Sequence, residues 1–152
     1  MKKKILLVSD FYEPHKSGIV TYIIQIINVL KSQNFEISIL TTKYKNNLKE
    51  IENINGINVI RCRPTLKISR GYYSIDLVLK FLKIYKNYDI INIHLPLTEI
   101  FPIAFLVSKK KTIVNYHCLP EFPFYLKFLK FYFYIFGILS VLKSSKNIVL
   151  SK

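Results

Sequence analysis

The sequence is poor in cysteine and glycine, and each shortage excludes a class of protein or site. The two cysteines, Cys62 and Cys118, lie far apart and show no metal-ligand spacing. A disulfide scaffold is therefore excluded, and a reduced, cytoplasmic setting is expected. Only four glycines are present. Gly18 follows Ser17, but three spaced glycines and a Gly-Lys-Ser/Thr loop are both missing, which excludes the dinucleotide fingerprint and the Walker loop.

No long apolar run follows the basic N-terminus. Residues 1–4 resemble the basic start of a signal peptide, but the apolar run at residues 5–8 is cut by Ser9 and Asp10. This run is too short for the hydrophobic region of a signal peptide. We therefore interpret it as a buried strand, and we expect a cytoplasmic protein.

Acidic residues are scarce as well, with 9 Asp and Glu against 23 Lys and Arg, for a formal net charge of +14. Such an excess favours an anionic partner: a nucleic acid, an acidic membrane surface or a phosphorylated ligand. Compositional drift is the alternative, because lysine, isoleucine and asparagine are abundant throughout. The lysines are scattered and no nucleic-acid-binding motif is present, so nucleic acid is not the expected partner.

What is present is an alternation of apolar, β-branched runs with amphipathic stretches over the whole chain, which is 51% hydrophobic. The runs predict strands at residues 5–8, 35–40, 57–61, 89–94, 112–117 and 147–150. The amphipathic spacing predicts helices at 19–31, 76–85, 97–107 and 122–142. Residues 43–55 are polar and are expected to form a mobile loop, with a turn at Asn55-Gly56. This order predicts one α/β domain over 1–152, a Rossmann-like parallel sheet with helices on both faces.

Candidate site residues follow the predicted strands. In a parallel sheet, ligands bind at the carboxyl ends of the strands. His94 and His117 end two successive strands, so their side chains are expected to lie close together. Ser17 and Gly18 begin a helix whose N–H groups could meet a phosphate. Structural roles, as a helix cap and as hydrogen-bonded histidines, are the alternatives. No carboxylate or cysteine completes a ligand set, so no metal is predicted.

The motifs resemble a known family when they are read in order. They are Lys4-Ile-Leu-Leu-Val-Ser-Asp-Phe-Tyr-Glu-Pro14, Ser17-Gly-Ile-Val-Thr-Tyr22, Phe35-Glu-Ile-Ser-Ile-Leu-Thr-Thr42, Asp89-Ile-Ile-Asn-Ile-His94 and Ile113-Val-Asn-Tyr-His117. This series resembles the N-terminal, acceptor-side domain of glycosyltransferase family 4, the first half of a GT-B fold. The resemblance covers essentially the whole chain.

The resemblance implies a retaining transfer of a sugar from a nucleotide-sugar donor to an acceptor, with no metal and no cofactor beyond that co-substrate. The family has a Gly-Gly pair in the first loop that approaches the donor phosphate; here the pair reads Ser17-Gly18. The family histidine that faces the donor sugar corresponds to His117, the expected catalytic residue. Glu13 and His94 are expected in the cleft on the acceptor side.

The family also has a second domain, which supplies the nucleotide pocket, basic phosphate-binding residues and a paired-glutamate motif. The chain stops after Lys152, before such a domain. The expectation is therefore half of a glycosyltransferase that needs a separate donor-binding domain or chain, because stabilisation of the leaving diphosphate would otherwise be missing. The alternative is a non-catalytic acceptor-binding or regulatory module.

The predicted helix at 122–142 is rich in aromatic residues and lysine. Lys127 and Lys130 interrupt its apolar run, so it suits a lipid interface better than a bilayer core, which needs about 20 apolar residues. Peripheral binding to an anionic cytoplasmic membrane face is the expectation, together with a lipid-linked or polysaccharide acceptor. A core helix, or a helix that docks on another domain, is the alternative.

Overall fold

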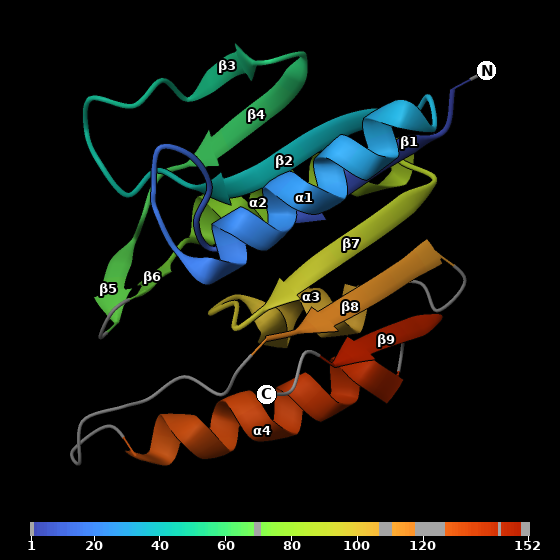
Figure 1. Cartoon of the computed structure of the whole chain (residues 1–152). Coiled ribbons are helices and arrows are strands. Elements are labelled where there is room, and N and C mark those ends of the chain that lie inside the picture. The colour runs from blue at the N-terminus through green and yellow to red at the C-terminus, as the bar shows by residue number, and fades with distance from the viewer. Residues whose placement is uncertain (1, 69–70, 107–110, 118–126, 143, 150–152) are drawn as a thin grey trace.

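The computed structural model describes residues 2–68, 71–106, 111–117, 127–142 and 144–149, in which strands and helices alternate (Figure 1). The strands are β1 (Lys4–Val8), β2 (Glu36–Thr42), β3 (Ile51–Ile54), β4 (Ile57–Cys62), β5 (Leu66–Ile68), β6 (Gly71–Tyr73), β7 (Ile90–Leu95), β8 (Thr112–Tyr116) and β9 (Lys146–Val149). The helices are α1 (Gly18–Ser32), α2 (Ile75–Ile84), the 3-10 turn η1 (Tyr85–Asn87), α3 (Ile100–Leu106) and α4 (Lys127–Leu142).

Seven strands form the main sheet, in the order β3-β4-β2-β1-β7-β8-β9, and β5 pairs with β6 in a separate two-stranded arm. All neighbours in the main sheet run parallel except β3, which pairs antiparallel with β4. The chain leaves β1 toward β2 and later returns to the other side of β1 as β7. The boundary between β1 and β7 is therefore the topological switch point of the sheet, where ligands bind in folds of this kind.

Both faces of the sheet are covered, as the continuous apolar run of β1 predicts. On one face Ile5 and Leu7 pack with buried residues of α1, and on the other Leu6 and Val8 join a core with α2, α3 and partly buried residues of α4. Figure 1 shows α1 in front of the sheet and α2 and α3 behind it. The predicted Rossmann-like α/β architecture with helices on both faces is confirmed.

The prediction of a loop at residues 43–55 is wrong at its end, because β3 lies there. Asn55 and Gly56, with φ of 51° and 81°, form the turn of a β3–β4 hairpin, and the Asn53 side chain accepts the Gly56 N–H at 2.8 Å. Positive φ at both central residues is what an Asn-Gly hairpin turn provides. The sequence pattern does not predict this strand, because it is a short edge strand, exposed along one side, with polar residues between Ile51 and Ile54.

Other boundaries shift by a few residues. The helix expected at 97–107 begins at Ile100, and the helix expected at 122–142 is described from Lys127 onward. Residues 107, 122–126 and 150 lie outside the described residues. The arm formed by β5 and β6 had no counterpart among the predicted elements, because its strands have three residues each.

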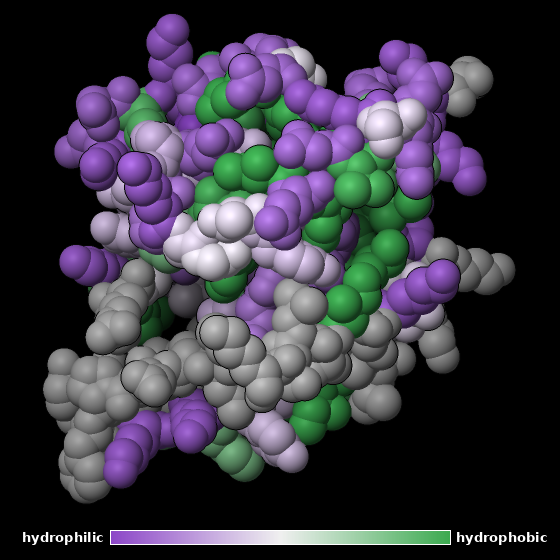
Figure 2. Space-filling model, viewed as in Figure 1, coloured by the Kyte–Doolittle hydropathy of each residue, from purple (hydrophilic) through white to green (hydrophobic). Residues whose placement is uncertain are grey.

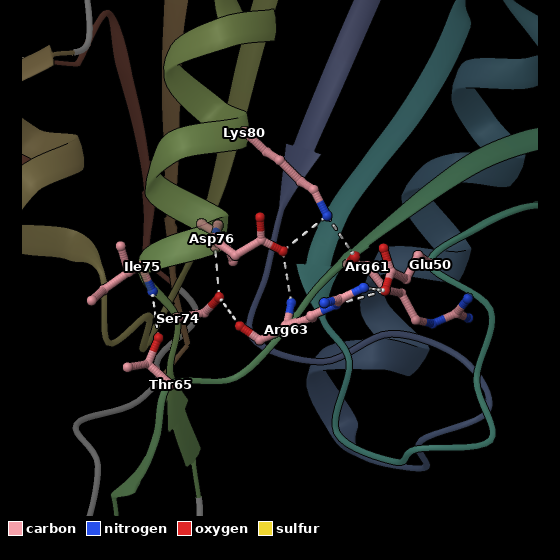
Figure 3. Close-up of polar contacts among 9 residues, drawn as sticks. Glu50, Arg61, Arg63, Thr65, Ser74, Ile75, Asp76 and Lys80 are labelled. Atoms are coloured by element: carbon pink, nitrogen blue, oxygen red, sulfur yellow. Dashed lines mark hydrogen bonds and ion pairs between the residues drawn. The ribbon is translucent and has the colours of Figure 1, made fainter.

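A charged network fixes the start of α2 to the end of β4 (Figure 3). Asp76 Oδ2 accepts the Arg63 N–H at 2.8 Å and pairs with Lys80 at 2.9 Å. Ser74 caps the helix, and its hydroxyl donates to the Arg63 carbonyl at 2.7 Å. An exposed ion pair of 2.7 Å joins Arg63 to Glu50. The charged groups of this network are paired with one another. Their role is therefore structural: they hold the start of α2 against the end of β4.

Candidate ligand site at the switch point

The site lies at the carboxyl ends of β1, β7 and β8, beside the start of α1. In Figure 1 these strand ends, the loop after β1 and the β5–β6 arm all lie at the same end of the sheet, the left of the view. The amino end of the sheet carries the N-terminus and the Asn55-Gly56 turn. The structure therefore gathers the predicted site residues at one end of the molecule.

His94 and His117 form a pair, as their strand positions predict. The Nδ1 atom of His94 lies 3.1 Å from Nε2 of His117, and the two rings stack with centroids 5.4 Å apart. The ladder between β7 and β8 is extended by the His117 N–H, which donates to the Leu95 carbonyl at 3.2 Å. This backbone bond holds His117 just past the end of β8. The proximity is confirmed, while the functional role of either residue stays a prediction.

Tyr22 of α1 lies against both histidine rings. Its centroid is 6.1 Å from that of His94 and 5.0 Å from that of His117, with the planes nearly perpendicular to the His117 ring. The Tyr22 hydroxyl donates to Asn115 Oδ1 at 3.4 Å, and Asn115 Nδ2 donates to Asn92 Oδ1. A helix and two strands are thereby joined by one buried polar chain. The chain fixes the Tyr22 ring, which packs against both histidine rings.

Burial disfavours the charged form of both histidines. His94 is 1% exposed, and burial, with the neighbouring His117 as a second cause, lowers the pKa of His94 to about 3. Burial lowers the pKa of His117 as well. Within the described residues, Nε2 of His94 is buried with no hydrogen-bond partner. A buried polar atom left without a partner is uncommon in folded proteins.

The start of α1 lies next to the pair. Ser17 caps the helix, and its hydroxyl oxygen accepts the Val20 N–H at 3.3 Å. Capping leaves the N–H groups of Gly18 and Ile19, which no hydrogen bond within the helix can use. Gly18 lies one turn before Tyr22 and so on the same helical face. A Cβ at Gly18 would meet nothing within 4 Å, so the backbone there is open to a ligand.

Glu13 belongs to a different set of contacts. Its carbonyl accepts a hydrogen bond from Arg61 Nη2 at 2.6 Å, and its carboxylate helps raise the pKa of Tyr12, after burial as the larger cause. Arg61 is fully buried and pairs with Glu52. The described contacts therefore anchor the loop through Glu13 and do not join it to the histidine pair. Its expected acceptor-side role stays a prediction.

Two buried carboxyl groups lie at the same end, beneath the opposite face of the sheet. Burial, with Glu99 as second cause, raises the pKa of Asp10 to about 8, and burial raises that of Glu99 to about 7. The Thr98 hydroxyl donates to Glu99 Oε2 at 2.9 Å, and the Ser74 N–H donates to Glu99 Oε1. These two hydrogen bonds favour the charged form of Glu99, but burial outweighs them and its pKa stays raised. Burial therefore moves the titration of both acids toward neutral pH.

The β5–β6 arm covers this carboxyl pair. A Cβ placed on Gly71 would lie 2.7 Å from Asp10 Oδ2, so only glycine lets the arm approach so closely. Oδ1 of Asp10 is buried without a hydrogen-bond partner among the described residues. The pair therefore depends on the arm for its exclusion from water.

In the described part of the chain, no three His, Cys, Asp or Glu side chains are grouped so that they could hold a metal ion. None of the helices described is both long enough and apolar enough to cross a bilayer. Cys62 is a free, buried thiol, and Cys118 lies outside the described residues.

Tyr22, Asn92 and Asn115 are the members of the site that sequence reasoning missed. A signal was available: Asn92 and Asn115 each stand two residues before a strand-end histidine. Side chains two residues apart point to the same face of a strand. The repeated Asn-x-His pattern thus places four polar side chains on one face of β7 and β8. This is the face that α1 covers.

Comparison with known proteins identifies the family. Residues 16–152 match the sequence profile of Glycosyltransferase Family 4. The fold is similar to a structure of sucrose-phosphate synthase from Thermosynechococcus elongatus, with a TM-score of 0.52, 19% identity, and coverage of 78% of this chain and 34% of that chain. A second structure of that synthase gives a TM-score of 0.60 at 15% identity, over 98% of this chain and 77% of that one. At these identities the likeness shows the fold alone. No curated protein matches the sequence significantly.

Proposed function

The chain belongs to glycosyltransferase family 4, and we propose that it is the acceptor-side domain of a retaining enzyme that transfers a sugar from a nucleotide-sugar to a glycan or lipid-linked acceptor. The observation that carries the proposal is the His94–His117 pair at the switch point, next to the open start of α1. The ring nitrogen of His117 that His94 does not occupy, together with a helix N-terminus, suits the hydroxyl and phosphate oxygens of such a substrate.

In this proposal each part of the site has one task. His117, at the mouth of the site, contacts the transferred sugar. The N–H groups at Ser17 and Gly18 approach the donor phosphate, where the positive end of the helix dipole favours negative charge. His94 and Glu13 belong to the acceptor side, His94 through the pair and Glu13 through the loop anchored on Arg61.

Activity requires a donor-binding domain in addition to these residues. The chain spans 34% of the sucrose-phosphate synthase chain that it resembles. Transfer leaves negative charge on the departing diphosphate, and cationic or N–H groups must stabilise it. Among the candidate site residues, the start of α1 offers such N–H groups. We therefore propose that a second domain, on the same or another chain, completes the enzyme.

The test is sugar transfer by the chain combined with that second domain. UDP- and GDP-hexoses labelled in the sugar serve as donors, and label in lipid or polymer is measured. His117→Ala is expected to lower transfer by about 100-fold, because a reacting group loses its positioning. Asn28→Ala, an exposed change on α1, is the matched control. Equal transfer by wild type and His117→Ala would refute the proposed role.

The second candidate is a non-catalytic acceptor-binding module. It is favoured if the chain binds the glycan or lipid acceptor but no donor-binding domain restores transfer. The same combined assay separates the two candidates, because binding and transfer are measured on one preparation.

We further propose that α4 binds an anionic membrane at the cytoplasmic face. Its exposed residues include Lys127, Lys130, Phe131, Tyr134 and Ile138, spaced so that aromatic and basic groups share one side. At the foot of Figure 2, where Figure 1 places α4, hydrophilic and hydrophobic residues lie side by side. Phe131 and Tyr134 are 68% and 55% exposed, and exposed apolar side chains that gather on one surface mark interaction sites. Aromatic rings and lysines together suit the lipid headgroup layer.

Vesicle sedimentation tests this surface. Phosphatidylglycerol vesicles are expected to bind the chain and phosphatidylcholine vesicles to bind it weakly. Lys127→Ala with Lys130→Ala should weaken binding about 30-fold, since each lysine near an anionic surface contributes about 1 kcal/mol. Lys83→Ala with Lys86→Ala, exposed on α2 and η1, is the matched control. Equal losses for both double variants would show that net charge, and not α4, governs binding.

A further inference from the structure

We propose that His94 fixes the tautomer of His117, so that His117 carries its proton on Nδ1 and presents an N–H, not a lone pair, to the ligand. His94 is then a positioning residue for the site. The inference rests on the proposed function only for the identity of the ligand. The tautomer itself is set by the contact between the two histidines and needs no ligand.

The number of protons on the two rings limits how they can pair. A neutral imidazole has one N–H and one lone pair. His94 is buried and neutral, so exactly one of its nitrogens is protonated. The 3.1 Å contact between His94 Nδ1 and His117 Nε2 needs one proton between the two atoms. Either His94 donates to His117, or His117 donates to His94.

The two arrangements differ in what they leave buried. If His117 donates, the proton of His94 must sit on Nε2, where the structure shows a buried atom with no partner among the described residues. If His94 donates through Nδ1, the same Nε2 carries only a lone pair. Orphaned N–H groups are rarer in proteins than under-satisfied acceptors. The geometry therefore favours donation from His94 Nδ1 to His117 Nε2.

This hydrogen bond determines which nitrogen of His117 can bind a ligand. Its Nε2 lone pair is occupied by His94, so its single proton must be on Nδ1. Which nitrogen of a histidine is protonated is set by the hydrogen bond that the other one makes. The half-buried ring of His117 then offers an N–H donor to the site. Its partner is an oxygen acceptor, a sugar hydroxyl or a phosphate oxygen. A neutral His117 in this state accepts no proton from a substrate hydroxyl through Nδ1.

Long-range ¹H–¹⁵N correlation spectra of the whole ¹⁵N-labelled chain test the tautomer directly, without any ligand. His117 is expected to show protonated Nδ1 and unprotonated Nε2. The excess over the other tautomer should be at least about fivefold, because an unsatisfied buried donor costs about 1 kcal/mol or more. His94→Ala should release His117 into a mixture of both tautomers. His94→Asn, whose amide can place an N–H near the Nδ1 position, should preserve the Nδ1–H form.

Several outcomes overturn the proposal. Protonated Nε2 on His117 in the wild type refutes it, and so does an unchanged tautomer in a folded His94→Ala variant. If His94→Ala fails to fold, the wild-type and His94→Asn spectra still decide. Addition of a UDP-hexose to the chain combined with the donor-binding domain is a separate arm: a shift of the Nδ1–H signal supports the oxygen ligand. If the wild-type tautomer is as expected and this signal does not move, the tautomer proposal stands and the proposed glycosyltransferase site is contradicted.

Discussion

The protein is expected to lose stability as the pH rises above about 7, and Asp10→Asn is expected to remove most of this loss. Asp10 is 8% exposed at the end of β1, and its raised pKa of about 8 means that folding keeps a proton which the unfolded chain releases near its ordinary value of 3.8. Stability from such a group is complete at low pH and is lost as pH rises through the folded pKa. The asparagine amide resembles the neutral acid and does not ionise.

The magnitude follows from proton linkage. Each pH unit over which the folded state holds one extra proton costs about 1.4 kcal/mol. From about pH 7 to about pH 8.5, Asp10 and the remaining titration of Glu99 together lower the free energy of unfolding by about 1–2 kcal/mol. The lowered pKa values of His94 and His117 act in the opposite direction, but their effect is nearly complete at the ordinary histidine value of 6.5. The window above pH 7 therefore reports on the carboxyl pair.

Urea unfolding, followed by circular dichroism at several pH values in this window, measures the slope. Wild type should lose stability with rising pH, and Asp10→Asn should be nearly flat. Asp89→Asn, which changes an exposed carboxylate at the amino end of the sheet, is the matched control and should keep the wild-type slope. A wild-type curve without a slope, or an equal slope in Asp10→Asn, would refute the reasoning.

Three further predictions concern single side chains. Ser17→Ala removes the cap of α1 and should lower the free energy of unfolding by about 1 kcal/mol, while Ser17→Gly should cost only a few tenths, measured by urea unfolding. Gly71→Ala should destabilise the fold because its Cβ would meet the Asp10 carboxyl, whereas Gly18→Ala should be tolerated; equal melting temperatures for the two variants would contradict the packing seen at Gly71. Arg61→Ala leaves buried carbonyl partners unpaired and should cost about 3 kcal/mol, and a loss below about 1 kcal/mol would show that the ion pair adds nothing net.

Most of the fold could be predicted because hydrophobic periodicity is strong where burial is two-sided. The run at 5–8 is apolar at every position, and the structure buries β1 on both faces. The prediction failed where one side of a strand faces water. Ile51 is 67% exposed, and a four-residue edge strand carries too few apolar positions to be distinguished from a loop. The β5–β6 arm is shorter still, and its place depends on contacts with Asp10 and Thr98 that no local pattern shows.

The candidate site was predicted in part. Strand-end positions were enough to bring His94 and His117 together, because the order of parallel strands determines which ends meet. The buried carboxyl pair could not be predicted, since Asp10 and Glu99 lie far apart in sequence and Glu99 stands in the connection between β7 and α3, not at the end of a strand. Only the fold shows that the end of β1 and the start of α3 bring Asp10 and Glu99 together beneath the β5–β6 arm.

The Asn55-Gly56 turn lies at an end of the molecule that carries none of the candidate site residues. It is exposed and stands at the amino end of the sheet, a full strand length from the histidine pair. Exposed loop tips with small residues are where chains accept insertions. A fluorophore, an affinity tag or a surface tether placed there would orient every molecule with its histidine pair facing away from the support, which makes single-molecule and surface-plasmon measurements of ligand binding practicable on the intact chain.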